Sequence, residues 1–386
     1  MTLANWQEKG FNEWAFSHVR ELIPTERIAR GAVPASPLDS GDAIDLEGVE
    51  VSVGVHRQSA AAVVNASNTD ALIMVHQGRI RVEQYGSTSA PDRTHILMSV
   101  SKSITSTLAG ILIGEGLLGA NDAVTHHVPS LIGTGFEGCT VQDLLDFRAG
   151  IAFSEDYDDL DADVRVYEQV AGHRPRTKSG LPSTLYAYMP GLARSGDHEG
   201  AFDYQSILTD ALAWVLECAA QATFAELVSS RIWSRVGAEF DAEVTVDPGG
   251  CALADGGICA TLRDVARFGL THLERGVVAD RLIVPRAWVL ECTRSNEGLA
   301  DAYRRGVERP DRFAMYHNNW WVLDTDRGIS AGLGIYGQFL YVDRSRDCVI
   351  AKFSSWPTAL DAGRGDLHFA LAEALCSRAE ETARSK

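Results

Sequence analysis

The chain has 386 residues, which is long enough for one large domain or two of medium size. Its hydrophobic content of 45% and charged content of 23% are those of an ordinary globular protein. The formal net charge of −17 argues against a surface that binds nucleic acid or an anionic membrane. No apolar run approaches the roughly 20 residues that a membrane-spanning helix needs.

The seven cysteines are odd in number, and none lies close to another in the sequence. This spacing is typical of reduced thiols rather than of a disulfide framework. The first ten residues lack the basic start and apolar segment of a secretory signal, so we expect a cytoplasmic protein. Motifs such as His-x-x-x-His and Cys-x-x-Cys are absent, and we therefore expect no metal site.

In chain order, the first predicted element is an amphipathic helix over residues 12–22. Residues 31–50 are rich in Gly, Pro, Ser and Asp and indicate a connector. Two short runs follow, residues 71–78 and 79–85, which meet at a Gln-Gly pair. The second run alternates between apolar and polar side chains, which predicts a β-hairpin with one buried face.

The next feature is a Ser-x-x-Lys motif, Ser99 to Lys102, at the start of an apolar helical run over residues 104–113. If Ser99 opens the helix, Lys102 lies one turn later, within reach of the serine hydroxyl. A serine hydroxyl becomes a strong nucleophile only when a neighbouring base takes its proton. Lys102 can be that base only if burial or another cation lowers its pKa. The motif therefore predicts a Ser-Lys nucleophile pair.

The surroundings of Lys102 favour a buried lysine over a solvent-exposed one. The chain has only five lysines, so its basic surface residues are mostly arginines. Lys102 also lies within a largely apolar segment that extends from Ile96 to Ile104. An exposed lysine on a helix surface is the simpler interpretation of the motif taken alone.

The sequence from 119 to 240 favours helices and loops. Helices are predicted over residues 140–146, 208–219 and 224–236. Residues 154–200 form a long stretch rich in Asp, Arg, Gly and Pro. A loop of that length inside a compact protein is usually a lid or a binding loop.

After residue 240, strands are predicted again, and the chain ends in a helix. The strands cover residues 243–246, 320–323, 335–342 and 348–353, and the helix covers residues 359–378. This order predicts an α/β fold in which residues 1–118 and 241–386 form a domain with an antiparallel sheet flanked by helices. Residues 119–240 form a mostly helical second domain, and the active site lies between the two.

Two later segments add candidate site residues. Tyr204 and Ser206 stand just before the predicted helix at 208–219, and a phenol there can relay a proton from Ser99 to a leaving atom. The plain alternative is a tyrosine that packs at a helix start. Residues 254–261 contain two glycines before a threonine-capped helix, which we interpret as a structural turn.

Taken together, these segments resemble the penicillin-binding-protein/class C β-lactamase-like serine hydrolases, and more closely the 6-aminohexanoate-dimer (nylon oligomer) hydrolases. The matching segments extend over nearly the whole chain, from Trp6 through the Ser99 motif and Tyr204 to the Ser-Ser-Trp-Pro segment at 354–357. The resemblance implies a β-lactamase/transpeptidase-like fold. It also implies that Ser99 is the nucleophile, Lys102 its base and Tyr204 the proton relay, with no organic cofactor.

The third motif of the family, Lys-Thr-Gly, is replaced here by residues 332–337. By the resemblance, the backbone amides of Ser99 and Ile335 form the oxyanion hole, with Gln338 as the alternative donor if the register differs. Tyr336 is then expected beside the substrate. The lysine that is absent is the usual anchor of a β-lactam carboxylate, which argues against β-lactamase activity.

The resemblance further implies that the long loop contacts the substrate. Tyr157 matches a substrate-binding tyrosine, Glu168 falls where the family has an aspartate, and His173 replaces a tryptophan. Asp255 stands where relatives often have asparagine. We expect all four in the cleft, with His173 as a titratable wall and Glu168 paired with a substrate ammonium. The alternative for each acid is a solvated loop charge.

The sequence therefore predicts a serine hydrolase that cleaves a small linear amide of the 6-aminohexanoate-oligomer type, or a short-chain carboxylic ester, through an acyl-enzyme. The expected partner is a small-molecule substrate rather than nucleic acid or a membrane, and a homodimer is left open. One alternative is a Gly-x-Ser-x-Gly elbow at Ser330, with Asp366 and His368 as its partners, which requires a strand before the serine and a helix after it. The other is a non-catalytic protein on the penicillin-binding scaffold.

Overall fold

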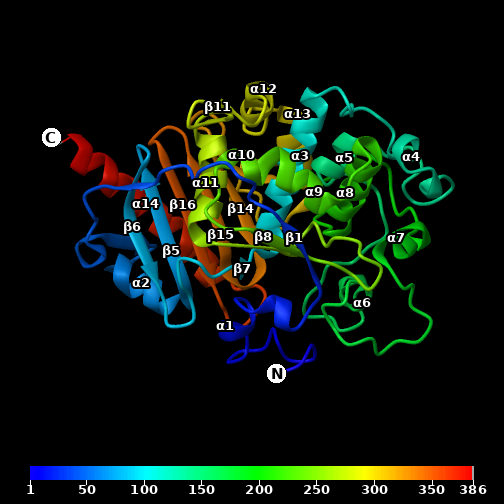
Figure 1. The fold of residues 1–386 in the computed structure, drawn as a ribbon, viewed down its shortest axis with the longest axis horizontal. Helices are drawn as coiled ribbons and strands as arrows, with labels where there is room; N and C mark the ends of the chain where they lie inside the picture. The colour runs from blue at the N-terminus through cyan, green and yellow to red at the C-terminus, as the bar shows by residue number, and fades with distance from the viewer. Residues whose placement is uncertain (385–386) are drawn as a thin grey trace.

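The main element of the structure is an eight-stranded sheet (Figure 1). The structure, a computed structural model, describes residues 1–384. The strand order is β12-β13-β14-β15-β16-β5-β6-β2, and all neighbours are antiparallel except the parallel pair of β2 and β6. The bounds of the strands are β2 (Asp39–Ser40), β5 (Thr69–His76), β6 (Arg79–Tyr85), β12 (Met315–His317), β13 (Trp320–Asp324), β14 (Ile329–Gly334), β15 (Gln338–Asp343) and β16 (Cys348–Ser354).

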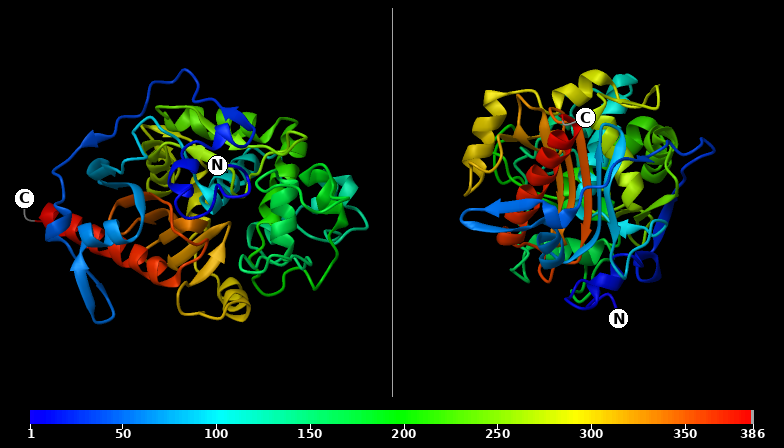
Figure 2. Two further views of the ribbon diagram at one scale, coloured as in Figure 1. Left: turned by 90° about the horizontal axis from the view of Figure 1, so that it is seen from below. Right: turned by 90° about the vertical axis from the view of Figure 1, so that its left-hand side faces the viewer.

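Helices cover both faces of this sheet (Figure 2). The helices α2 and α14 pack on one face, while α11 and the start of α3 pack on the other. Their bounds are α2 (Ala60–Ala66), α3 (Ser101–Gly114), α11 (Leu262–Leu273) and α14 (Ala362–Arg384). The sheet is thus buried on both sides.

The side chains of β5 show why a run of apolar residues forms this central strand. Successive side chains of a strand point to opposite faces. Leu72 and Met74 accordingly pack with Leu375 of α14, whereas Ile73 and Val75 join the core on the other face. Because both faces are covered, the strand is continuously apolar rather than alternating.

The segment between residues 119 and 240 is helical, and its core is continuous with the core on the α11 face of the sheet. Its helices are α4 (Val124–His127), α5 (Val141–Leu145), α6 (Asp163–Val170), α7 (Leu185–Tyr188), α8 (Ile207–Ala220), α9 (Phe224–Val228) and α10 (Ser234–Val236). The predicted long loop over residues 154–200 thus contains α6 and α7. No single helix among residues 1–384 is long and apolar enough to cross a membrane; α8 and the run Phe224–Val236 meet the criteria only as a pair bent by 77°.

A smaller four-stranded sheet, with the order β1-β8-β9-β7, positions the Ser-x-x-Lys motif. Its strands are β1 (Thr25–Ile28), β7 (His95–Ile96), β8 (Ala242–Thr245) and β9 (Ile258–Ala260). Because β7 precedes Ser99 and β9 follows Asp255, the pairing of these two strands brings residues far apart in sequence together. The other elements are α1 (Asn12–Ala15), β3 (Glu50–Val53), β4 (His56–Ser59), β10 (Val277–Val278), β11 (Arg281–Leu282), α12 (Arg286–Glu291) and α13 (Glu297–Gly306).

Two predicted elements differ from the observed ones for local physical reasons. The helix predicted over residues 12–22 is only the short α1 followed by a 3₁₀ turn, because the Phe16 carbonyl accepts a hydrogen bond from Ile96 N at 2.8 Å. The strand predicted from Ile335 begins at Gln338, because Tyr336 adopts a left-handed conformation with φ 59°. The glycine-rich β14 was not predicted, since small residues give no alternating pattern.

A buried ion pair fastens the β12–β13 hairpin to the helical segment. His317, at the end of β12, lies with Nδ1 2.7 Å from Asp146 Oδ1, and both side chains are buried. Asn318 and Asn319 form the turn with φ 49° and 56°, which asparagine tolerates better than most residues. Burial alone would lower the pKa of His317, but the Asp146 carboxylate raises it to about 9.

Loss of this ion pair is expected to destabilise the protein in a pH-dependent way. The pKa of His317 is raised above the roughly 6.5 of an unfolded chain, so its stabilisation is complete below about pH 6.5 and is lost as the pH rises through about 9. His317→Gln should therefore lower the Tm more at about pH 6 than at about pH 9.5, as measured by thermal denaturation against the exposed control His126→Gln. An equal loss of Tm at both pH values would contradict this account.

Candidate active site

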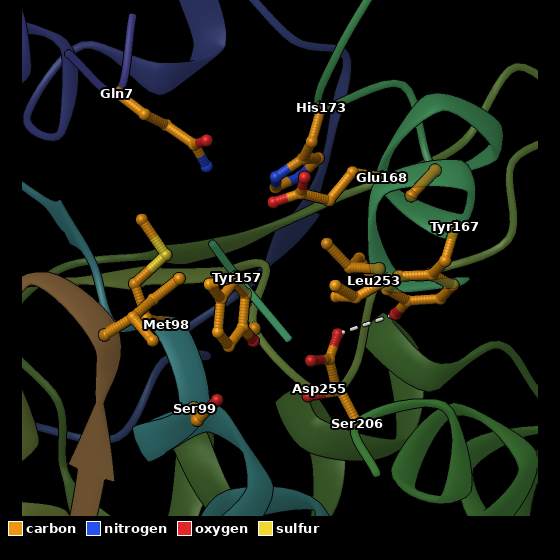
Figure 3. Close-up of a pocket in the computed structure, with 14 residues that line it drawn as sticks. Gln7, Met98, Ser99, Tyr157, Tyr167, Glu168, His173, Ser206, Leu253 and Asp255 are labelled. Atoms are coloured by element: carbon orange, nitrogen blue, oxygen red, sulfur yellow. Dashed lines mark hydrogen bonds between the residues drawn. The ribbon is translucent and has the colours of Figure 1, made fainter. Parts of the chain in front are cut away.

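Ser99 is presented to a cavity by an unusual backbone turn. Met98 adopts a left-handed conformation with φ 45°, which is rare for a residue with a side chain. The turn follows β7, where Leu97 N donates a hydrogen bond to Ile258 O at 2.8 Å. Ser99 then lies in a 3₁₀ turn that leads directly into α3. Its side chain is largely buried but lines the cavity drawn in Figure 3.

Lys102 joins three segments of the chain through its ammonium group. Its Nζ donates to Ser99 Oγ at 2.8 Å, to Ser206 Oγ at 2.9 Å and to Asp255 Oδ2 at 3.0 Å. Only 1% of the lysine is exposed. An ammonium group has three donors, so each finds an acceptor without help from water. The sequence-based expectation that Lys102 reaches the Ser99 hydroxyl agrees with this geometry.

The charge on Lys102 differs from the sequence-based expectation. Burial alone would lower its pKa, but the Asp255 carboxylate, with Tyr204 and Glu155 nearby, raises the pKa above its ordinary value. The lysine in the free protein is therefore an ammonium rather than a neutral base. The Lys102 ammonium is stabilised because residue 255 is an aspartate, where relatives often have asparagine. An asparagine would leave the charge of Lys102 unpaired, whereas Asp255 forms a buried ion pair with it.

A chain of hydrogen bonds extends behind Asp255. Tyr167 OH contacts Asp255 Oδ1 at 2.8 Å, as the dashed line in Figure 3 shows, and also contacts Asp210 Oδ2. One phenol carries one proton, so one of the two carboxyl groups must be the donor. Burial and the charge of Asp255 raise the pKa of Asp210 well above its usual range, which makes Asp210 the protonated partner. Tyr167 and Asp210 thereby hold Asp255 in place as the counterion of Lys102.

Tyr204 is the third predicted catalytic residue, and it also contacts Ser99. Its ring stacks on Trp321 of β13 with ring centres 5.6 Å apart, and Lys102 Nζ lies 5.3 Å from the ring centre. Burial raises the pKa of the Tyr204 hydroxyl, while the Lys102 charge and a hydrogen bond with Ser99 act in the opposite direction. The phenol is thus protonated and in contact with the Ser99 side chain. This is the position that a proton relay requires.

Glu155 is a site residue that the sequence analysis did not single out. It accepts hydrogen bonds from Tyr157 OH at 2.8 Å, from Ser206 Oγ at 2.6 Å and from the Ser206 backbone amide. Burial raises the pKa of its carboxyl group. The sequence contained little to distinguish Glu155, because it is followed by another acid, Asp156, and lies in a segment that was expected to be a loop. Only its contact with Ser206, across 51 positions, identifies it.

Two cavities meet at Ser99. The smaller one, of about 40 Å³, includes Tyr157, Glu168, His173 and Asp255 in its lining (Figure 3). The larger one, of about 480 Å³, is mostly apolar and is lined by Glu155, Tyr157, Tyr204, Phe313, Trp321, Leu333 and Phe339, among others. A substrate bond held at Ser99 would thus have one end in each cavity.

The segment that replaces the third motif is placed by β14 and β15. Ile335 lines both cavities beside Ser99, whereas Gln338 lines only the larger one and its side chain donates to the Ser354 carbonyl at 2.7 Å. Tyr336 lines neither cavity that contains Ser99. Its ring packs 5.2 Å from Phe16 because the left-handed backbone turns the side chain toward the N-terminal segment. The structure thus places Tyr336 outside the two cavities that contain Ser99, whereas the sequence analysis expected it beside the substrate.

Glu168 and His173 line the smaller cavity, as expected, but Glu168 is already paired with arginines and His173 is uncharged. Glu168 accepts a hydrogen bond from Arg165 Nη1 at 2.8 Å and another from Arg174 Nε. Its charge is therefore already balanced by two arginines. His173 donates to or accepts from Thr245 Oγ1 at 2.9 Å, and burial lowers its pKa to about 4. The histidine is thus neutral at physiological pH rather than a titrating wall.

The alternative nucleophile Ser330 does not lie in an elbow. It is the second residue of β14, paired with Val322 on one side and Val342 on the other, and only 3% of it is exposed. The chain continues into another strand rather than into a helix, so the required strand–turn–helix geometry is absent there. In the described part of the chain, no group of three or more His, Cys, Asp or Glu side chains is arranged to hold a metal ion.

Comparison with known proteins agrees with this site. A family model described as Beta-lactamase matches residues 60–374. The chain belongs to the beta-lactamase family. A curated relative, 6-aminohexanoate-dimer hydrolase of Paenarthrobacter ureafaciens, is 34% identical over 365 residues, which is 92% of this chain and 88% of the relative. The chain is therefore a serine hydrolase, with the amide- and ester-cleaving members of this family as its relatives.

Solved structures show the same fold. A candidate 6-aminohexanoate-dimer hydrolase from Bacillus anthracis superimposes with a TM-score of 0.87 at 24% identity, covering 99% of this chain and 97% of that one. A family VIII carboxylesterase gives a TM-score of 0.61 at 15% identity, covering 81% and 95%. The predicted β-lactamase/transpeptidase-like fold is thus confirmed.

The ion pair at Lys102 leads to a prediction about pH. Asp255→Asn removes a negative charge at hydrogen-bond distance, so the pKa of Lys102 should fall and its neutral form should appear at lower pH. If neutral Lys102 is the base, kcat/KM rises with pH as the lysine loses its proton. The midpoint of that rise should therefore move to lower pH by about 1 unit or more in the variant. The measurement is the pH–rate profile of ester hydrolysis beside the exposed control Asp156→Asn. An unchanged midpoint would show that Asp255 does not set the charge of Lys102.

Proposed function

We propose that this protein cleaves small linear amides of the 6-aminohexanoate-oligomer type, or short-chain carboxylic esters, through an acyl-enzyme on Ser99. The observation that carries the proposal is the buried hydrogen-bonded group of Ser99, Lys102 and Tyr204 at the junction of two cavities. The 34% identity to a 6-aminohexanoate-dimer hydrolase supports a linear amide as the substrate. The structural likeness to a carboxylesterase extends only to the fold.

In the proposed first step, Ser99 Oγ attacks the carbonyl carbon and its proton passes to Lys102. The lysine acts in its neutral form, so the step becomes faster as the pH rises toward the raised pKa of Lys102. The oxyanion that forms is stabilised by the backbone amides of Ser99 and Ile335, and this role is supported by the fact that both residues line both cavities. The ion pair with Asp255 stabilises the ammonium that results.

In the second step, the bond to the leaving nitrogen or oxygen breaks. The Tyr204 hydroxyl, which is hydrogen-bonded to Ser99, gives its proton to the leaving atom and regains one from the Lys102 ammonium, whose Nζ lies 5.3 Å from the centre of the Tyr204 ring. The product is an ester of Ser99. Water then attacks this ester, with Lys102 and Tyr204 acting in the reverse order, and the carboxylic acid is released.

Tyr157 is proposed to orient the scissile amide. Its hydroxyl is fixed by donation to Glu155 at 2.8 Å, so its oxygen can accept a hydrogen bond from the N–H of a substrate amide. Tyr157 lines both cavities, as a residue at the scissile bond must. Glu168, His173 and Asp255 border the acyl end of the substrate in the smaller cavity. An ester has no such N–H and does not gain this contact.

The role of Ser99 is tested by substitution. Ser99→Ala should lower kcat/KM for p-nitrophenyl acetate and for a linear amide by roughly 3–6 orders of magnitude, because the nucleophile is lost. Ser330→Ala, the matched control on β14, should retain nearly full activity. Mass spectrometry of the trapped acyl-enzyme should place the added acyl group on Ser99. An inactive Ser330 variant beside an active Ser99 variant would overturn the assignment.

The role of Tyr157 predicts a difference between amides and esters. Tyr157→Phe removes the hydrogen-bond acceptor, so kcat for the amide should fall by about 10-fold, the value of one ordinary hydrogen bond. The kcat for p-nitrophenyl acetate should change little, because that ester has no N–H and a good leaving group. Equal losses on both substrates, measured by steady-state kinetics, would indicate a general structural effect instead.

A further inference from the structure

The larger cavity continues from Tyr204 along a row of aromatic side chains. Tyr204 stacks on Trp321 at 5.6 Å, Trp321 contacts Phe313 at 4.8 Å, and Phe313 contacts Phe369 of α14 at 5.6 Å between ring centres. All four line the same cavity of about 480 Å³. The row thus forms an apolar wall that begins at the proposed proton relay and ends at the C-terminal helix.

The wall ends at a single arginine. The guanidinium of Arg312 lies 5.6 Å from the ring centre of Phe313 and 5.4 Å from that of Phe369, and it lines the cavity. Its only ion pair among residues 1–384 is with Asp366, at 3.3 Å, and Arg309 approaches the same carboxylate at 3.9 Å. Two arginines therefore share one carboxylate, which leaves a positive charge at this end of the cavity. The buried Nε of Arg312 has no hydrogen-bond partner within the described residues.

The other ionisable groups of the cavity wall do not offset this charge. Asp361 is paired with Arg364 of α14, and Glu155 is held by Ser206 and Tyr157 at the Ser99 end. His368 Nε2 is hydrogen-bonded to the buried Lys352 Nζ at 2.8 Å, and burial lowers the pKa of that histidine well below its usual range. An anion at the far end of the cavity would therefore meet Arg312 with no competing free carboxylate on the wall.

The smaller cavity on the opposite side of Ser99 has a different character. Its volume of about 40 Å³ holds roughly three water molecules, enough for a short acyl group. The carboxylate of Glu168 at its end is already paired with Arg165 and Arg174. An acyl group that enters this cavity therefore meets no unpaired carboxylate among the acids that line it.

We propose that the larger cavity is the leaving-group subsite, and that it accepts an apolar chain ending in a carboxylate, which Arg312 binds. The inference rests on the proposed function, because Tyr204 would deliver its proton to the leaving atom at the entrance of this cavity. The substrate class is then an N-acyl derivative of an amino acid whose amino and carboxylate groups are separated by an apolar chain. Hydrolysis releases the acyl group as a carboxylic acid, together with the free amino acid.

The test compares two amides that differ only in the terminal charge, N-acetyl-6-aminohexanoate and N-hexylacetamide. The wild-type protein should favour the acid by about 10- to 150-fold in kcat/KM, the range of a charge-assisted hydrogen bond. Arg312→Met should reduce this ratio to near 1. The matched control Arg309→Met, an exposed arginine on the same segment, should retain the ratio because it does not line the cavity.

Inhibition gives a second readout that does not depend on amide turnover. Free 6-aminohexanoate should compete with p-nitrophenyl acetate, and its inhibition constant should rise at least 10-fold in Arg312→Met. A wild-type protein that is acylated at Ser99 but does not favour the acid, or a variant that retains the ratio, would overturn the subsite alone. Absence of acylation at Ser99 would instead overturn the proposed function.

Discussion

The site depends on one buried cation. The ammonium of Lys102 is bound by Ser99 in the turn before α3, by Ser206 at the start of α8 and by Asp255 in the turn before β9. A buried ammonium is costly unless each of its protons is accepted and its charge is balanced. Burial of the Lys102 ammonium is therefore favourable only when all three segments are in place around it. The same contacts that satisfy Lys102 also place the Ser99 hydroxyl between the two cavities.

The sheets supply the rigidity that these contacts need. The pairing of β7 with β9 holds the turn at Met98 in its rare left-handed conformation, and β14 leads directly to Ile335 beside Ser99. β14 belongs to the eight-stranded sheet, which helices cover on both faces, so the backbone at its end near Ser99 has little freedom to move. A rigid backbone of this kind is what the proposed oxyanion hole requires.

The charges around the site differ between its two sides. Near the smaller cavity, every acid has a partner: Asp255 pairs with Lys102, and Glu168 pairs with two arginines. Near the larger cavity, many side chains are aromatic, and the charge of Arg312 is only partly balanced because Arg312 shares Asp366 with Arg309. In low-dielectric surroundings such differences have a large effect on which charged group can enter. The two proposed subsites therefore differ in the pairing of their charges as well as in their shape.

The fold class and the nucleophile motif could be predicted from the sequence. Long apolar runs such as β5 and the helix after Ser99 follow from local periodicity, and the spacing of Ser99 and Lys102 follows from the pitch of a helix. The charge and pairing of the site's ionisable groups, in contrast, depend on contacts between distant parts of the chain. The raised pKa of Lys102 comes from Asp255, 153 positions away, and the paired state of Glu168 comes from side-chain rotamers that no pattern encodes. Contacts over such separations depend on strand pairing and close packing, whereas a sequence pattern reports only near neighbours.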